Sequence, residues 1–172
     1  MAAGAGGHAG QQSPFALVRE IREWFAGPIA LSGAIATGES LLAARALGAD
    51  LGYTGSPFIA TDEANADQGY KDMIVESGAE DIVYSSLFTG VSGNYLRGSI
   101  QNAGMDPDNL PEGDLKTMNF GDTREKPKAW KTIWGSGQGI GAVKDVLPVA
   151  ALVDRFEREF EDAWARLQER MA

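Results

Sequence analysis

Residues 28–61 read PIALSGAIATGESLLAARALGADLGYTGSPFIAT, and this stretch decides the fold. The apolar run Ile29–Leu31 is short and bounded by turn residues, as in a strand that is buried on both faces. A helix is predicted after Thr37, its N-cap, and it ends before Gly48. A second strand is expected near Leu51–Thr54. Two parallel strands joined by one helix form a right-handed βαβ unit, so the sequence predicts an α/β fold.

A glycine turn follows each of the two predicted strands. Ser32 and Gly33 follow the first strand, and Gly55 and Ser56 follow the second. Ligands of α/β sheets bind at the carboxyl ends of strands, and the last two loops of an eight-stranded barrel commonly hold phosphate. The helix after the first turn would point its positive end at such an anion. Glycine turns also serve as plain connections, so spacing alone leaves both readings open.

Two further glycine-rich motifs flank the segment just described: an early Ala5-Gly-Gly-His-Ala-Gly10 and a late Trp134-Gly-Ser-Gly-Gln-Gly-Ile-Gly141. In this order the three motifs resemble those of the nitronate monooxygenase family, formerly called 2-nitropropane dioxygenase, and of the related FMN-dependent enoyl-acyl-carrier reductases. The resemblance covers most of this chain but implies only the C-terminal portion of a family member. It implies the last strands of a partial TIM (β/α)8 barrel over residues 1–80. Residues 81–172 would form an extension with a lid-like loop and a long C-terminal helix.

The resemblance also implies an activity: FMN-dependent oxidation of alkyl nitronates or nitroalkanes by O2 to a carbonyl compound and nitrite. It implies His8 as the catalytic base, although a lone histidine near a terminus is by itself a surface residue. Ala34 replaces a usual glycine, and Tyr53 stands where the family often has glutamine. The implied cofactor-binding residues are Gly6, Gly7, Ser32, Gly33, Ala34, Tyr53, Thr54, Gly55, Ser56 and Gln138.

Two alternatives stay open at this stage. The first is an FMN-dependent enoyl-acyl-carrier reductase, which would need a nicotinamide donor. The second is an inactive truncated subdomain, or an interaction piece that uses the C-terminal helix. Because two strands cannot close a barrel, self-association or a separate chain that supplies the missing strands is a further expectation. The small-molecule partners implied are a nitronate or nitroalkane and O2.

Composition narrows the function classes. The net charge of −9 over 172 residues argues against a general nucleic-acid surface, which needs a basic patch. The absence of cysteine excludes disulfides, thiolate metal sites and cysteine nucleophiles. No apolar run approaches the length of a membrane span, so a cytoplasmic location is the default expectation. The acidic residues near Asp106 lack EF-hand spacing, and we expect no metal site.

The remaining chain predicts several further elements. Gly137, Gly139 and Ala142 fit a dinucleotide fingerprint, but no strand precedes them, so we reject that reading. Arg97 is given no catalytic role, since an arginine beside Tyr95 is usually solvated or pairs with a carboxylate. The predicted elements are helices over Ser13–Phe25, Asp62–Ser77 (capped by Thr61) and Pro148–Met171, strand-like runs at Ile82–Tyr84 and Leu87–Phe88, a loop over Ala103–Pro127 and a helical piece at Ala129–Trp134.

Overall fold

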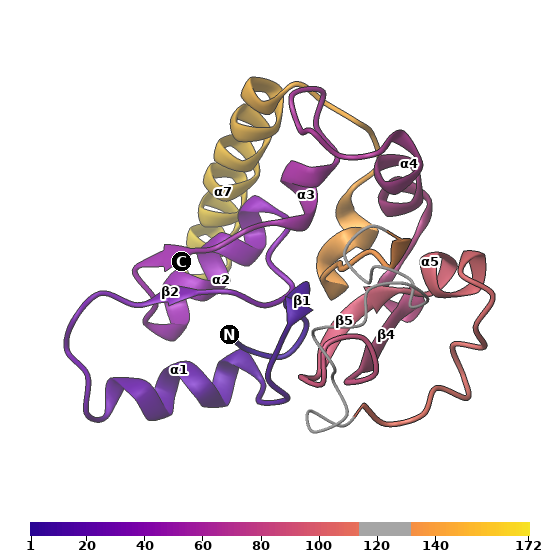
Figure 1. Ribbon diagram of the computed structural model, residues 1–172. Coiled ribbons are helices and arrows are strands. Elements are labelled where there is room, and N and C mark those ends of the chain that lie inside the picture. Colours follow the sequence, from indigo (N-terminus) through magenta and orange to yellow (C-terminus); the bar gives the residue numbers. More distant parts are fainter. Residues whose placement is uncertain (114–131) are drawn as a thin grey trace.

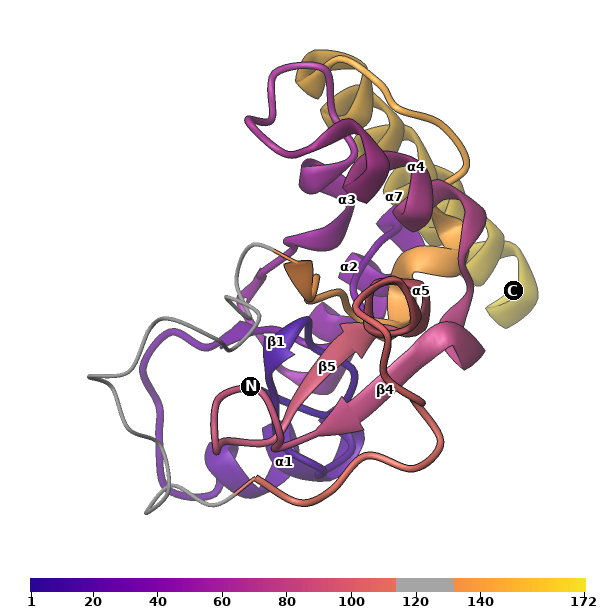
Figure 2. The same ribbon diagram turned by 45° about the vertical axis from the view of Figure 1, so that its right-hand side comes forward.

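The computed structural model describes residues 1–113 and 132–172, which contain two small sheets. A parallel pair joins β2 (Ala30–Leu31) to β3 (Leu51–Gly52). An antiparallel sheet has the order β1 (Gly7–His8), β5 (Gly93–Leu96), β4 (Ile82–Ser85), and Figure 2 shows these three strands side by side. In Figure 1 the parallel pair lies on the left with α1, α2 and α7, and the antiparallel sheet lies on the right with α5.

The predicted βαβ unit is confirmed. Ala30 pairs with Leu51 and Leu31 pairs with Gly52 in parallel register. Helix α2 (Gly38–Leu47) begins with a capping box, in which the Thr37 side chain accepts a hydrogen bond from the Ser40 N–H. The helix ends at Gly48, whose φ of 105° is a left-handed conformation that glycine adopts without strain.

Helix α1 (Pro14–Arg22) begins as predicted, because the Ser13 side chain accepts from the Phe15 N–H. The prediction that it reaches Phe25 is wrong. Arg22 donates to the carbonyl oxygens of Phe25 at 3.3 Å and Gly27 at 2.6 Å, and these bonds hold the chain in a turn beyond the helix. Trp24 is therefore 75% exposed, whereas Val18 is fully buried against the parallel pair.

The helix predicted over Asp62–Ser77 begins later, as α4 (Gln68–Glu76). Asp67 caps it by accepting from the Gly69 N–H, so the predicted Thr61 cap is wrong. Thr61 is buried and forms a parallel bridge with Leu147. A short helix that the sequence did not predict, α3 (Ser56–Ile59), follows the second glycine turn directly.

The strand predicted at Ile82–Tyr84 is confirmed as β4, preceded by a 3-10 turn, η1 (Ala79–Asp81). The run Leu87–Phe88 is a turn and not a strand. The second strand of this region is β5, which is buried at all four positions and leads into α5 (Arg97–Asn102). The sequence does not predict β5, because Gly93 is typical of a break in a strand; here a Cβ at Gly93 would lie 2.7 Å from the Gly7 carbonyl oxygen, so the close approach of β1 requires glycine.

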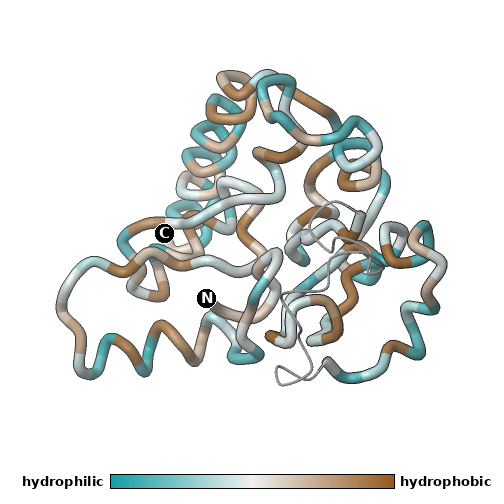
Figure 3. The backbone as a smooth tube through the Cα atoms, viewed as in Figure 1, coloured by the Kyte–Doolittle hydropathy of each residue, from teal (hydrophilic) through white to brown (hydrophobic). Residues whose placement is uncertain are grey.

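The long C-terminal helix is confirmed as α7 (Val149–Met171), which follows Pro148 and packs along α2. Hydrophilic and hydrophobic segments alternate along it in Figure 3. Its apolar stripe is narrower than predicted, since Leu152, Phe156 and Ala163 are buried whereas Trp164 is 52% exposed.

Some predictions fall on residues outside the described ranges. The loop predicted over Ala103–Pro127 is described to residue 113, where it contains no helix or strand after α5, and its remainder lies outside. The helical piece at Ala129–Trp134 lies outside as far as residue 131. The division at residue 80 stays a prediction. In the two described ranges, no helix has the length and hydropathy needed to cross a membrane.

Candidate functional site

A cavity of about 270 Å³ lies where the N-terminal loop, both glycine turns and residues 133–139 meet. Segments far apart in sequence thus converge on one cavity, as expected if the three motifs form one site. The predicted site residues that line it are Gly6, Gly7, Ser32, Gly33, Ala34, Tyr53, Gly55 and Ser56. His8, Thr54 and Gln138 are not among the lining residues.

The first glycine turn is held tightly by the N-terminal loop. Gly33 has a φ of 145°, and Ala34 has a φ of 54°. A Cβ at Gly33 would lie 2.6 Å from the Ala3 carbonyl oxygen, so packing requires glycine here. The Ala34 N–H donates to the Gly4 carbonyl oxygen at 3.1 Å. The Ala34 N–H is therefore already bonded within the chain.

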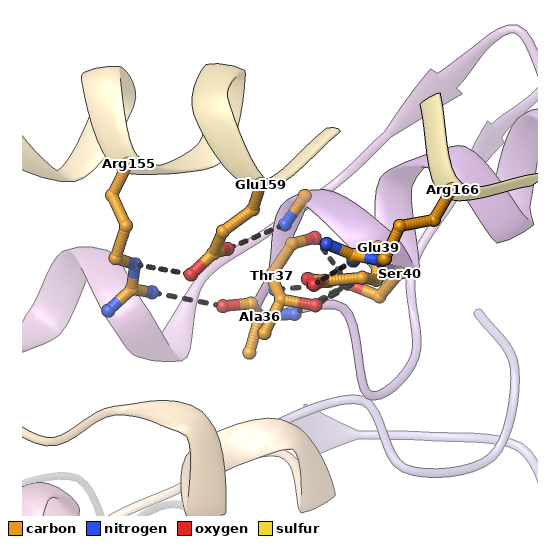
Figure 4. A network of polar contacts seen from close by, with 8 residues as sticks. Ala36, Thr37, Glu39, Ser40, Arg155, Glu159 and Arg166 are labelled. Atoms are coloured by element: carbon orange, nitrogen blue, oxygen red, sulfur yellow. Dashed lines mark hydrogen bonds and ion pairs between the residues drawn. The ribbon is translucent and has the colours of Figure 1, made fainter. Parts of the chain in front are cut away.

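The N-terminus of α2 is occupied by the chain itself. The Gly38 N–H donates to Glu159 Oε2 of α7 at 2.8 Å. Arg155 pairs with Glu159 at 3.3 Å and donates to the Ala36 carbonyl oxygen at 3.1 Å. Figure 4 shows both side chains reaching from α7 to the start of α2. The prediction that this helix turns its positive end to a bound anion is wrong, because a carboxylate of α7 already lies there.

Glu39 adds a further ion pair to the same junction, with Arg166 Nη2 at 3.1 Å from its Oε1. A hydrogen bond from its own backbone N–H lowers the pKa of Glu39, and Thr37 and Arg166 lower it further. A Cβ at Gly38 would collide with the backbone of Phe156 and Phe160. Gly38 therefore serves the close approach of α2 to α7.

The second glycine turn is open. Gly55 has an ordinary φ of −120°, and a Cβ built there would meet nothing within 4 Å. Within residues 1–113 and 132–172, the N–H groups of Gly33, Gly55 and Ser56 have no protein acceptor. The Ser56 hydroxyl accepts from the Gly137 N–H at 2.9 Å, and Thr54 Oγ1 donates to the Ile35 carbonyl oxygen at 3.2 Å. This turn can therefore present backbone donors to an anion.

Residues 135–139, the glycine strip, form the opposite wall. The Ser136 N–H donates to the Asn94 carbonyl oxygen at 3.2 Å, and the Gln138 N–H donates to the Gly4 carbonyl oxygen at 2.9 Å. The 3-10 turn η3 (Gln138–Ala142) begins within the strip, and the Gln138 side chain is exposed beside Gly4. Gly135 forms an antiparallel bridge with Tyr95. This strip is not a strand–turn–helix unit, which agrees with the rejection of a dinucleotide-binding motif.

His8 lies in β1, next to Gly7 of the cavity wall, and is half-buried. Its Nε2 is 2.9 Å from Thr89 Oγ1. Thr89 Oγ1 also lies 2.9 Å from the Val91 carbonyl oxygen, to which its hydroxyl can donate. Thr89 thus holds the His8 ring in place, and the tautomer of the ring decides which of the two groups donates.

Two aromatic residues of the cavity were missed as site residues. Tyr70 of α4 and Trp134 stack with ring centroids 5.0 Å apart and an interplanar angle of 9°. The Tyr70 hydroxyl donates to the Gly135 carbonyl oxygen, and burial raises the pKa of Tyr70 to about 12. Both residues also line an adjoining hollow of about 490 Å³. Helical periodicity places Tyr70 on a buried face but cannot show that this face meets the cavity.

Arg97 lies away from the cavity, in α5. It pairs with both carboxylate oxygens of Asp108 at 2.9 Å, which is one of the two roles expected of it. Hydrogen bonds from Asn109 and from the Asp108 N–H lower the pKa of Asp106. Asp106 and Asp108 thus accept hydrogen bonds from neighbouring groups of the chain.

The nitronate monooxygenase family model matches residues 2–159. A nitronate monooxygenase of Paraburkholderia phytofirmans is 27% identical over 96% of this chain and 49% of its own length. The nitronate monooxygenase npaC of Metarhizium robertsii is 28% identical over 87% of this chain and 47% of its own length.

Solved structures show a shared α/β fold. FabK of Thermotoga maritima superposes with a TM-score of 0.72 at 24% identity, over 98% of this chain and 56% of FabK. The nitroalkane oxidase of Streptomyces ansochromogenes gives a TM-score of 0.69 at 22% identity, over 96% of this chain and 52% of its own. The partial-barrel detail of the predicted fold stays a prediction.

The chain spans about half the length of the curated relatives it matches. These matches do not support the C-terminal placement expected from the motif order. The relatives are oxidoreductases by name, and the family match covers nearly the whole chain. The chain therefore belongs to the nitronate monooxygenase family.

Proposed function

We propose that this chain binds FMN in the cavity and serves the oxidation of alkyl nitronates by O2 to a carbonyl compound and nitrite. The observation that carries the proposal is the convergence of both glycine turns and the Gly6–Gly7 segment on one cavity in a member of this family. On this proposal the phosphate lies at the glycine turns and the flavin ring lies toward Gly7 and His8.

The backbone N–H groups of the second glycine turn fit a phosphate better than those of the first. The unpartnered N–H groups of Gly33, Gly55 and Ser56 would hold it. Ala34 would contact it without its N–H, which Gly4 already binds. A Cβ at Gly7 or Gly55 would enter open space, so these glycines leave room for a ligand. Tyr53, Thr54, Ser32 and Gln138 would complete the surroundings.

When bound, FMN would carry electrons between the nitronate and O2, so that two nitronate ions and one O2 give two carbonyl molecules and two nitrite ions. His8 would take the proton next to the nitro group, with its ring oriented by Thr89. A nitronate already lacks that proton. His8 should therefore matter for neutral nitroalkanes and little for nitronates.

The test is an absorption spectrum of the purified chain with FMN, run with size-exclusion chromatography and followed by nitrite assays. We expect flavin in the protein peak and oxygen-dependent nitrite release from an alkyl nitronate. A peak without flavin would overturn the proposal, and flavin reduction by a nicotinamide donor without nitrite release would indicate the reductase alternative. His8→Asn should lose activity toward neutral nitroalkanes only.

We also propose that a second copy of this chain pairs with strand β3. Both residues of β3 are exposed, with Leu51 at 63%, and the following Tyr53 is 66% exposed. In the described ranges β3 pairs only with β2, so its other edge can pair with a further strand. Parallel strands are also normally covered on both faces, whereas β3 is exposed. In size-exclusion chromatography, Leu51→Lys should shift the peak from the mass of an assembly to the mass of one chain. A wild-type peak at the mass of one chain would contradict this proposal.

A further inference from the structure

The glycine strip depends on other segments for its position. Three of its five residues are glycines, so it has few side chains with which to pack. Hydrogen bonds from its own N–H groups fix it to β5, to the N-terminal loop and to α3 through Asn94, Gly4 and Ser56. A Cβ at Gly6 would lie 2.9 Å from the Gly137 nitrogen, which shows how closely the strip approaches the N-terminal loop.

Tyr70 contacts this strip from a different direction, across the cavity rim. Its hydroxyl donates to the Gly135 carbonyl oxygen, and its ring stacks on Trp134, the residue before the strip. Because burial raises its pKa to about 12, the hydroxyl keeps its hydrogen throughout the physiological range. Tyr70 lines both the cavity and the adjoining hollow.

The helix that carries Tyr70 is itself firmly placed. The next residue, Lys71, is only 6% exposed, and its Nζ donates to the Thr61 carbonyl oxygen at 2.6 Å. Thr61 in turn bridges to Leu147. A hydroxyl on a firmly placed helix such as α4 can hold the glycine strip in position, whereas a hydroxyl on a mobile loop could not.

We infer that Tyr70 is a positioning residue: its hydroxyl bond to Gly135 holds the glycine strip in place as the cavity wall and so determines how tightly a flavin is bound there. The flavin part of this inference rests on the proposed function. The positioning part concerns the chain alone and is measurable without any ligand.

The experiment compares Tyr70→Phe with Tyr84→Phe. Tyr84 is a matched control, because its hydroxyl also donates to a backbone carbonyl, that of Ala9 at 2.9 Å, and Tyr84 does not line the cavity. Amide hydrogen exchange is measured at Ser136, Gly137 and Gln138, whose N–H groups are all bonded. FMN affinity and the visible circular dichroism of bound FMN are measured on the same samples.

In Tyr70→Phe we expect exchange at the three amides to rise by about tenfold, the scale of one lost hydrogen bond. FMN affinity should fall by a similar factor and the visible spectrum should change, while Tyr84→Phe changes none of these. Unchanged exchange in Tyr70→Phe, or an equal rise in Tyr84→Phe, would overturn the positioning role. Faster exchange with unchanged FMN affinity and spectrum would overturn the link to flavin. Failure of the wild-type chain to bind FMN would overturn the proposed function and the link to flavin, while the exchange data decide the positioning role separately.

Discussion

The two glycine turns of this chain look alike in sequence and differ in structure. Each follows a short parallel strand, and each lines the same cavity. At the first turn Gly33 has a left-handed φ of 145° and lies against the N-terminal loop. At the second, Gly55 has an ordinary φ of −120° and a Cβ there would meet nothing within 4 Å. The first glycine is required by packing, and the second is not.

This difference teaches that a glycine motif has two physical causes. A backbone that must turn or pass close to another chain segment needs glycine whether or not a ligand binds. A glycine in open space with an ordinary φ has no such reason, and it leaves room for a ligand that approaches the backbone. The second turn, with its two unpartnered N–H groups, is therefore the better candidate for phosphate.

The largest expected effect is that of Gly33→Ala. The new Cβ would lie 2.6 Å from the Ala3 carbonyl oxygen, at a φ that alanine tolerates poorly. Strain and displacement each cost roughly 1–3 kcal/mol, so the free energy of unfolding should fall by several kcal/mol. Denaturant unfolding measures this. A variant as stable as the wild type would show that the first turn is less constrained than its contacts indicate.

Gly55→Ala should separate binding from stability. The added methyl group would enter the cavity without touching protein, so the melting temperature should stay the same or rise slightly. FMN affinity should fall by about tenfold, which corresponds to roughly 1.4 kcal/mol. Fluorescence titration with FMN measures the affinity. If Gly55→Ala bound FMN normally, the phosphate would not lie at the second turn.

The sequence predicts the βαβ unit because Thr37 and Gly48 mark both ends of its helix locally. It also identifies most of the cavity, since the three motifs that converge there are recognisable one by one. It does not predict that Glu159 occupies the α2 N-terminus, because that contact joins residues 121 positions apart. Tyr70 was missed as a site residue for the same reason, since its partner Gly135 lies 65 positions away.

Ala34→Gly tests the strain at the first turn in the opposite direction. Ala34 has a φ of 54°, and no other non-glycine residue in the described ranges has a positive φ. A left-handed conformation costs alanine about 1–2 kcal/mol, partly offset by the larger backbone entropy that glycine loses on folding. The variant should therefore gain up to about 1 kcal/mol in stability. Thermal unfolding measures the gain, and a loss would mean that the alanine methyl group contributes packing that outweighs the strain.

The smallest effect concerns the strand that leads into the first turn. Asp50 accepts hydrogen bonds from the Ile29 N–H at 2.8 Å and from Arg22 at 2.5 Å. These bonds, the backbone one first, hold the pKa of Asp50 below its ordinary value. Because the folded pKa lies below the unfolded value of about 3.9, the ionised carboxylate stabilises the fold above that pH. The contribution disappears as the pH falls through the folded pKa.

Asp50→Asn should therefore lower the melting temperature slightly at pH 6 and by progressively less on acidification toward pH 3. The effect is small because the carboxylate is exposed to solvent, which screens the ion pair. Glu157→Gln, at an exposed position on α7, is the control for general charge effects. A gap between wild type and Asp50→Asn that stays constant with pH would mean that the Asp50 carboxylate protonates alike in the folded and unfolded chain. The link between β2 and α1 would then rest on the Arg22 bonds to carbonyl oxygens, which do not titrate in this range.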